Sequence, residues 1–415
     1  QLLININPDG SWPESLRYQN AALRRFALYA KALKNITGED WFSSTPLKNL
    51  FEYLIYVQTP PYIYFNNKIS TPPFGDHVLS DGQDFSLFGL YLSDIEKINK
   101  NLADKMYYTW KLAGFPSTSY HPESVAIENL FANADNYMPQ ENYIFDLESG
   151  KSFIYGGTHI FRDNFLSSKQ SFFAAMCSGK KIGHGHLDQG SFILYKDSIP
   201  IILDSGIEGY FEGSTMWHIS SYSHAVVQFQ SKKTDFIKAD TRQINLSAGT
   251  YSLERGFSDV PDSSELLKYS NSQEIKELFI KIQNPEREGF HIRKFFYIPK
   301  ADICIIYDKI FDFKGKIIFN LPVVSKNSII KSKNKIYSTG FYGIDLETEF
   351  LSEISEIYIE KGKSAPMFPA INGMYKMDYI RAVSNAENGF LTILHPINSS
   401  SEKMKINIKN ENYFI

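Results

Sequence analysis

Residues 184–192 read His184-Gly185-His186-Leu187-Asp188-Gln189-Gly190-Ser191-Phe192 and lead directly into an apolar segment. The stretch places two of the nine histidines of the chain one residue apart. Histidine changes charge close to neutral pH and is the commonest metal ligand, so the pattern favours a metal ligand, a proton-transfer group or both. A polar loop between two strands is the simpler interpretation, because short motifs also occur by chance.

Two further polar side chains flank short apolar runs. Asp204 closes the run 198–203 and is followed by the turn residues Ser205 and Gly206. His224 precedes the strand-type run 225–229. Two imidazoles and one carboxylate suit Zn²⁺ with a fourth position open, so His186, Asp204 and His224 could hold one cation. The three ligands would lie at the ends of three strands, and the ion would cross-link a sheet.

These motifs resemble the metal-binding β-domain of the heparinase II/III-like polysaccharide lyases, a superfamily that includes heparin, heparan, oligoalginate and related uronan lyases. The resemblance implies that His184 faces the substrate, whereas His186, Asp204 and His224 bind one structural zinc ion per chain. The family often has His-Asn-Thr after the last ligand, where this chain has His224-Ala225-Val226. The metal role survives that difference, but no contact of the asparagine is carried over.

The different roles of His184 and His186 predict a bent backbone. Side chains at positions i and i+2 of a regular strand point to the same face, so a regular strand could not separate the two roles. Gly183, Gly185 and Gly190 would permit the bend, because glycine adopts conformations that other residues avoid.

A second motif lies near the beginning of the chain, Asp9-Gly10-Ser11-Trp12-Pro13-Glu14-Ser15-Leu16-Arg17-Tyr18. Taken alone, it is a loop followed by a helix start with a packed tyrosine. The same lyases carry an Asp-Gly-x-x-x-Glu-x-x-x-Tyr stretch in an (α/α) toroid, where the tyrosine is the proposed proton shuttle. Tyr18 matches that tyrosine, so the resemblance implies that Tyr18 and His184 are catalytic.

The chemistry of a uronan lyase explains these residue types. The enzyme removes the C5 proton beside the uronate carboxylate and expels the C4 oxygen, which requires a base, an acid and a group that neutralises the carboxylate. Tyr18 and His184 could divide the two proton transfers in either way. The family's neutralising residue comes from a helix before the tyrosine motif, and we expect it to lie upstream of this chain.

Four further side chains are candidates for substrate binding: Glu14, His77, Arg162 and Lys181. Arg162 lies in a stretch that resembles a family strand leading toward the active site, and Lys181 precedes His184 by three positions. An arginine could bind an acidic group, but a surface arginine is an equal alternative. The same holds for Lys181, and His77 could instead be a hydrogen-bonded loop histidine.

Composition limits the class of protein. The chain has 415 residues, of which 43% are hydrophobic and 21% charged, as in ordinary soluble globular proteins of two or three domains. A net charge of −3 argues against nucleic acid as a partner. No apolar run is long enough to span a membrane. Cys177 and Cys304 show no metal spacing and are expected to be buried free thiols.

The ends and the residue usage carry two further expectations. The chain begins with Gln1 and shows no signal-peptide pattern, so we expect a processed or truncated product. The abundance of Lys, Asn and Ile suggests a bacterial origin, and we expect a periplasmic or secreted protein. The oligomeric state stays open.

Hydrophobic periodicity predicts a helical first part. Apolar residues recur at helical spacing at Ala22, Phe26, Tyr29, Ala30 and Leu33, and Gly38 is a plausible stop. Further helices are predicted over 46–56, 85–92, 96–113 and 122–132. After about residue 142 the pattern changes to short strands, predicted over 152–155, 158–162, 171–176, 192–195, 201–203, 292–298, 303–307 and 317–321. Residues 325–335 should form a solvated hairpin edge.

The resulting fold prediction is a multidomain α+β protein. Residues 1–148 would form a partial (α/α) toroid and residues 149–415 an antiparallel β-sandwich, because many closely spaced short strands favour a sandwich over a parallel sheet.

The predicted function is cleavage of a uronic-acid polysaccharide, of the glycosaminoglycan or alginate type, by β-elimination. One alternative is a glycoside hydrolase that uses two carboxylates such as Glu14 and Asp76. Another is a non-catalytic carbohydrate-binding protein. A metal-dependent amidohydrolase is the weakest, because it would need further ligands from a parallel barrel. The substrate, the choice of endo or exo action, and syn or anti elimination stay open.

Overall fold

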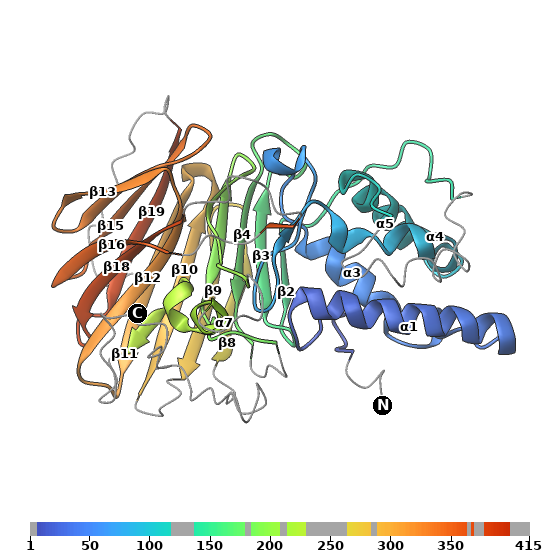
Figure 1. Ribbon diagram of the computed structural model, residues 1–415, viewed down its shortest axis with the longest axis horizontal. Helices are drawn as coiled ribbons and strands as arrows, with labels where there is room; N and C mark the ends of the chain where they lie inside the picture. The colour runs from blue at the N-terminus through green and yellow to red at the C-terminus, as the bar shows by residue number, and fades with distance from the viewer. Residues whose placement is uncertain are drawn as a thin grey trace.

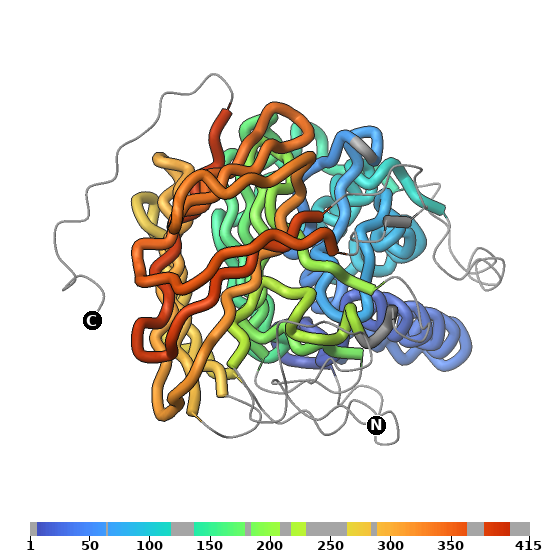
Figure 2. Tube along the Cα trace, turned by 60° about the vertical axis from the view of Figure 1, so that its left-hand side comes forward, coloured from blue at the N-terminus to red at the C-terminus, as the bar shows by residue number. Residues whose placement is uncertain are grey.

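The computed structural model describes residues 6–117, 137–178, 184–207, 214–229, 264–283, 289–362, 367–368 and 377–398. The helices lie at one end of its longest axis, and the strands of a nine-stranded and an eight-stranded sheet fill the rest (Figure 1). Figure 2 shows the same arrangement from another side, with the blue and cyan helical part against the green strands. The helix predicted over 122–132 lies outside the described residues.

The first layer contains α1 (Leu16–Thr37), α2 (Trp41–Ser44), α3 (Leu47–Val57), α4 (Phe88–Glu96) and α5 (Lys100–Leu112). Helices α1, α3, α4 and α5 confirm the helices predicted before Gly38 and near 46–56, 85–92 and 96–113, whereas the short α2 was not predicted. Helix α1 ends at Gly38, where a φ of 79° lets the glycine N–H bond the carbonyl of Lys34. Tyr29 was predicted on the apolar face but is 56% exposed, because the buried face runs through Leu23, Phe26, Ala27 and Ala30.

The nine-stranded sheet has the order β16 (Glu356–Lys361), β18 (Met377–Asn385), β12 (Lys316–Val324), β6 (Ile199–Ile202), β5 (Phe192–Lys196), β4 (Ser171–Met176), β3 (Thr158–Asp163) and β2 (Gly150–Phe153), with β7 (Val227–Phe229) also paired to β12. The eight-stranded sheet has the order β13 (Asn327–Ser332), β14 (Lys335–Thr339), β15 (Ile344–Phe350), β19 (Phe390–Asn398), β11 (Ile303–Phe311), β10 (Phe290–Ile298), β9 (Lys276–Gln283) and β8 (Ser264–Asn271). Neighbouring strands in both sheets are antiparallel. The predicted antiparallel sandwich is confirmed.

Shorter elements complete the described chain: β1 (Leu79–Ser80), which pairs in parallel with β17 (Met367–Phe368), α7 (Ser214–Ile219), and the 3₁₀ turns η2 (Ile63–Phe65), η3 (Gln83–Phe85), η5 (Ser221–Ser223) and η7 (Pro299–Ala301). The predicted hairpin edge forms β13 and β14, with β13 at the edge of the eight-stranded sheet. Cys177 and Cys304 are buried free thiols, as predicted. None of the described helices combines the length and hydropathy that crossing a membrane requires.

The central strands of the nine-stranded sheet are buried on both faces. In β4, Phe173 and Ala175 contribute to the core between the two sheets, whereas Phe172 and Ala174 contribute to the core shared with the helices. Because that second core is continuous across the helices and the sheet, the division at residue 148 stays a prediction. The described helices do not show a closed toroid.

A buried ion pair within the eight-stranded sheet orients an arginine that also bonds loops of the nine-stranded sheet. Arg293 of β10 lies opposite Asp308 of β11, with Nε 2.7 Å from Oδ1 and Nη2 3.0 Å from Oδ2. The Nη1 group of Arg293 donates to the carbonyls of Gly190 and Ala225, at 2.8 and 2.6 Å. Arg293 of the eight-stranded sheet therefore holds the two loops that precede β5 and β7 of the nine-stranded sheet.

We expect Asp308→Asn to lower the free energy of unfolding by about 3–5 kcal/mol, because it leaves a buried guanidinium without its counter-charge. Urea denaturation followed by circular dichroism measures the loss. The control is Glu347→Gln, which breaks a partly exposed pair with Lys335. That variant should lose less than about 1 kcal/mol. Equal losses in the two variants would show that the buried pair has no special weight.

Candidate functional site

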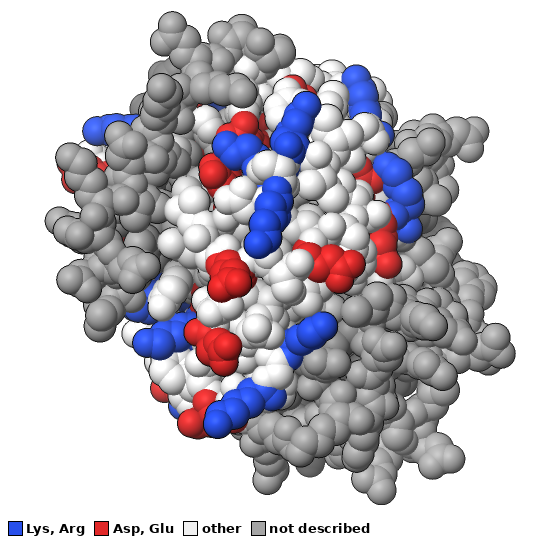
Figure 3. Space-filling view, turned by 90° about the vertical axis from the view of Figure 1, so that its left-hand side faces the viewer, with Lys and Arg blue, Asp and Glu red and all other residues white. Residues whose placement is uncertain are grey.

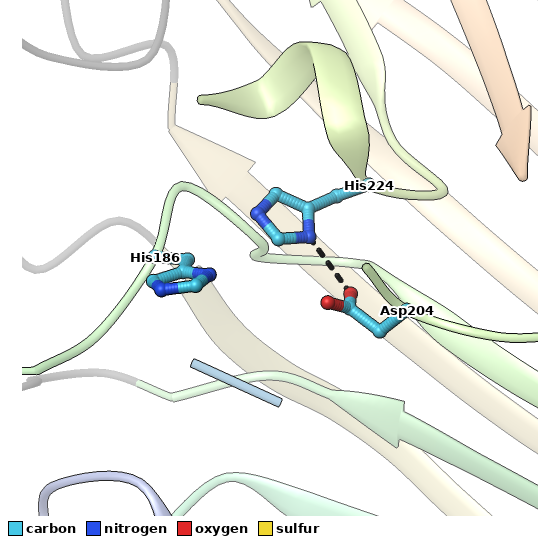
Figure 4. Close-up of side chains that lie close together, drawn as sticks. All are labelled: His186, Asp204 and His224. Carbon is cyan, nitrogen blue, oxygen red and sulfur yellow. Dashed lines mark hydrogen bonds and ion pairs between the residues drawn. The ribbon is translucent and has the colours of Figure 1, made fainter. Parts of the chain in front are cut away.

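Three buried side chains converge at one end of the nine-stranded sheet (Figure 4). His186 lies in the loop before β5, Asp204 follows β6, and His224 lies between η5 and β7. One potential ligand atom from each lies within 4.8 Å of those of the other two. The arrangement of donors at three strand ends is therefore the one predicted from the sequence.

Hydrogen bonds fix the carboxylate of Asp204. His224 Nδ1 lies 2.8 Å from Oδ2, the hydroxyl of Ser191 donates to Oδ2 at 3.0 Å, and the amide of Gly206 donates to Oδ1 at 3.1 Å. Burial raises the pKa of Asp204, but His224, His186 and the Gly206 amide more than offset this, so the pKa lies below its usual value. The carboxylate of Asp204 is therefore held in its ionised form, which is the form that can bind a cation.

His186 is anchored on one nitrogen. Its Nε2 lies 2.8 Å from Oδ1 of Asp76, and both side chains are fully buried. Its Nδ1 is buried with no hydrogen-bond partner among the described residues. Leaving a buried polar atom unbonded is costly, and an imidazole held by a carboxylate on its other nitrogen is typical of a metal ligand. Two imidazoles and one carboxylate fit zinc.

Tyr18 and His184 form a second group beside this cluster. Their rings stack with centroids 3.4 Å apart and planes 12° from parallel. His184 Nδ1 lies 3.0 Å from Oε1 of Glu14, and Trp12 Nε1 donates to Oε2 at 2.8 Å. The side chain of His184 is 32% exposed and that of Glu14 is 23% exposed, so solvent and solutes reach this group.

The charge of Glu14 sets the orientation of the His184 ring. Burial raises the pKa of Glu14, but the hydrogen bonds from His184 and Trp12 outweigh it, and the pKa lies below its usual value. An ionised carboxylate only accepts hydrogen bonds, so His184 Nδ1 donates to it. In the neutral imidazole the lone pair then resides on Nε2, which can accept a proton.

The predicted bend is present, although its position differs from the expectation. His184 itself has a φ of 47°, and Gly190 has a φ of 84°, whereas Gly185 is not among the positive-φ residues. The carbonyl of His184 accepts a hydrogen bond from the amide of Asp76 at 3.0 Å, which supports the unusual conformation. Gly183 lies outside the described residues.

Two substrate-binding assignments do not hold. His77 is fully buried, with Nε2 2.7 Å from the hydroxyl of Thr71 and 3.6 Å from Asp84. Arg162 is 1% exposed and donates to the carbonyl of Tyr56, and burial lowers its pKa to about 10. Both side chains support the fold and are not presented to a substrate.

The two remaining assignments have different outcomes. Lys181 lies outside the described residues, so its role stays a prediction. Glu14 is engaged by His184 and Trp12, which favours an orienting role over direct contact with a substrate.

Asp76 is the residue that the sequence did not reveal as part of the site. It was considered only as a hydrolase carboxylate paired with Glu14, but it is fully buried and bonded to His186. A buried carboxylate cannot flank a glycosidic bond, so the geometry argues against that hydrolase. The signal in the sequence was only a proline- and glycine-rich turn, because the two partners are 110 positions apart.

No protein-family model matches the chain, and no curated protein matches it. Among solved structures, the heparan sulfate lyase HepC from Pedobacter heparinus aligns over 96% of this chain and 55% of its own, with a TM-score of 0.63 and 16% identity. A heparinase III aligns over 96% and 56%, with a TM-score of 0.65 and 16% identity. The heparinase III BT4657 gene product aligns over 96% and 54%, with a TM-score of 0.60 and 14% identity.

The chain therefore spans about half the length of the structures that it matches. At these identities the likeness establishes the fold, and it confirms the resemblance expected from the histidine motif at that level. The chain has the fold of the heparinase-type polysaccharide lyases.

Proposed function

We propose that this protein is a polysaccharide lyase that cleaves a uronic-acid-containing polysaccharide by β-elimination. The observation that carries the proposal is the Tyr18–His184 stack, with Glu14 bonded to Nδ1 of the histidine. It supplies two proton-transferring groups side by side in a partly exposed position. The fold supports the same class of reaction, because the structures that share it include a heparan sulfate lyase.

The geometry supports a division of the proton transfers. Glu14 holds the proton of His184 on Nδ1, so the lone pair of the neutral imidazole lies on Nε2. We assign removal of the C5 proton of the uronate to this Nε2 atom. The hydroxyl of Tyr18, stacked on the same ring, then protonates the C4 oxygen as the bond to it breaks. The electron pair of the broken C5–H bond forms the C4=C5 double bond, and the electron pair of the broken C4–O bond leaves with the oxygen that Tyr18 protonates. The proton taken up by His184 then returns to the deprotonated Tyr18, its neighbour in the stack, which balances the reaction.

We propose that His186, Asp204 and His224 hold a structural zinc ion. Bound there, the ion would act as a Lewis acid that neutralises the buried carboxylate and cross-links three loops. The residues of the chain have the complementary task of orienting the donors: Asp76 fixes His186, and Ser191 fixes Asp204. None of the proton transfers above passes through this cluster.

An acidic polysaccharide is the proposed partner, and the site is the proposed place of contact. The face opposite the helices shows lysines, arginines, aspartates and glutamates interspersed (Figure 3), so its described part has no field of a single sign to attract a polyanion. Lys181 stays a candidate for contact with an acidic group. We also propose that helices α1 to α5 belong to an (α/α) toroid and that the protein acts in the periplasm or outside a bacterial cell.

Ultraviolet absorbance of the unsaturated uronate tests the function. The protein is incubated separately with heparan sulfate, hyaluronan, chondroitin sulfate and alginate, and we expect absorbance to rise with one of them, because elimination creates a double bond conjugated with the carboxylate. New reducing ends without absorbance would contradict elimination and indicate a hydrolase. Binding without either product would indicate a carbohydrate-binding protein.

Tyr18→Phe tests the roles within the site. The variant keeps the ring and its stack on His184 but lacks the hydroxyl, so we expect kcat to fall by about 100-fold to 10,000-fold with an unchanged melting temperature. Tyr29→Phe on the same helix is the control, because Tyr29 is 56% exposed and lies on the outer face. Normal turnover in Tyr18→Phe would refute the assignment.

A further inference from the structure

The segment from Thr71 to Ser80 is buried at every position, although it is rich in turn-forming residues. It lies between the helical part and the loops of the nine-stranded sheet. The carbonyl of His77 accepts a hydrogen bond from the amide of Ile207 at 3.0 Å. The side chain of His77 is held by Thr71, whose hydroxyl donates to Asp84 at 2.8 Å. The segment is thus fixed against the chain that follows Asp204.

Asp76, at the centre of this segment, contacts both functional groups. Its carboxylate accepts a hydrogen bond from His186 Nε2 at 2.8 Å, so Asp76 contacts one member of the His186–Asp204–His224 cluster. Its amide donates to the carbonyl of His184 at 3.0 Å, and its own carbonyl accepts from the hydroxyl of Ser15 at 3.1 Å. Ser15 is the N-cap of α1, and its carbonyl accepts from the amide of Tyr18 at 3.0 Å.

Close packing holds the same contacts. Gly75 has a φ of 66°, and a Cβ atom on it would lie 2.8 Å from the carbonyl oxygen of His184 and 3.2 Å from Cβ of Ser15. There is therefore no room for the segment to shift toward His184 or α1 without moving them. A displacement of the segment toward these neighbours would therefore push on His184 or on Ser15.

We propose that Asp76 is a positioning residue that couples occupancy of the His186–Asp204–His224 cluster to the geometry of Tyr18 and His184. A metal ion on the cluster gives the His186 ring a second anchor, on the nitrogen that Asp76 does not hold. The ring then keeps Asp76 in place, and the backbone of Asp76 keeps His184 and the first turn of α1 in place. Without the ion, the ring can reorient and this chain of contacts loosens.

This inference rests on the proposed function for its consequence, but its physical content can be measured without a substrate. Side-chain nitrogen NMR of ¹⁵N-histidine-labelled protein reports the environment of each imidazole, and the signal of His184 is assigned with His184→Ala. Zinc is titrated into metal-free wild type, into Asp76→Asn and into a control. The control is Asp104→Asn, which removes another fully buried carboxylate, bonded to Tyr137 and Lys100 in the helical part.

We expect zinc to shift and sharpen the His184 signal in wild type and in Asp104→Asn. In Asp76→Asn the zinc affinity, measured by competition with a chelator, should fall about 10–100-fold, because a partner that orients a ligand has gone. Even at saturating zinc the His184 response should be absent from Asp76→Asn, and kcat should stay below the wild-type value. An unchanged KM would accompany that loss, because Asp76 does not reach the surface.

Two results would overturn the coupling. One is a wild-type His184 signal that does not respond to zinc, and this needs no variant, so it decides the question even where Asp76→Asn does not fold. The other is an equal response of His184 in wild type and Asp76→Asn at saturating zinc, which would leave Asp76 as a support for His186 alone. A protein without lyase activity that still shows the coupled response would refute the proposed function and keep this inference.

Discussion

The hydrogen bond between Asp76 and His186, 2.8 Å long and fully buried, is the contact on which the site depends. It joins a segment that packs with the helices to a loop of the sandwich. A buried carboxylate without a donor costs several kilocalories per mole, so the two parts of the chain are held in one relative position at this point. The Tyr18–His184 stack requires that position, because its two rings come from opposite sides of the same boundary.

Most of the candidate functional residues also lie at this boundary. The nine-stranded sheet buries one face against the second sheet and the other against the helices, and the loops at its end carry His184, His186, Asp204 and His224. From the side of the second sheet, Arg293 holds the carbonyls of Gly190 and Ala225, each within four positions of a cluster histidine. The site is thus supported from both neighbouring layers, whereas its partly exposed end offers His184 and Glu14.

The sequence predicted the elements and the cluster well, because both leave local signals. Short apolar runs ending in Asp204 and beginning after His224 marked two of the three candidate ligands, and the i, i+2 spacing marked the third. Arg162 was misjudged because β3 is covered on both faces, so the alternation that separates inside from outside in a half-exposed strand fails there. His77 was misjudged because its turn-rich segment looks like a surface loop but is buried at every position from 71 to 80. Asp76 left no signal, because its partner is 110 positions away and pairing at that distance is set by tertiary packing.

Anomalous diffraction at the zinc absorption edge tests the central claim, that the three donors form a metal centre holding this boundary together. Crystals are grown from protein purified without chelators, and a second set from His186→Ala. A single zinc peak enclosed by His186, Asp204 and His224, and missing from the variant, is the predicted result. A native crystal with no zinc peak there, or with its zinc bound elsewhere, would contradict the account.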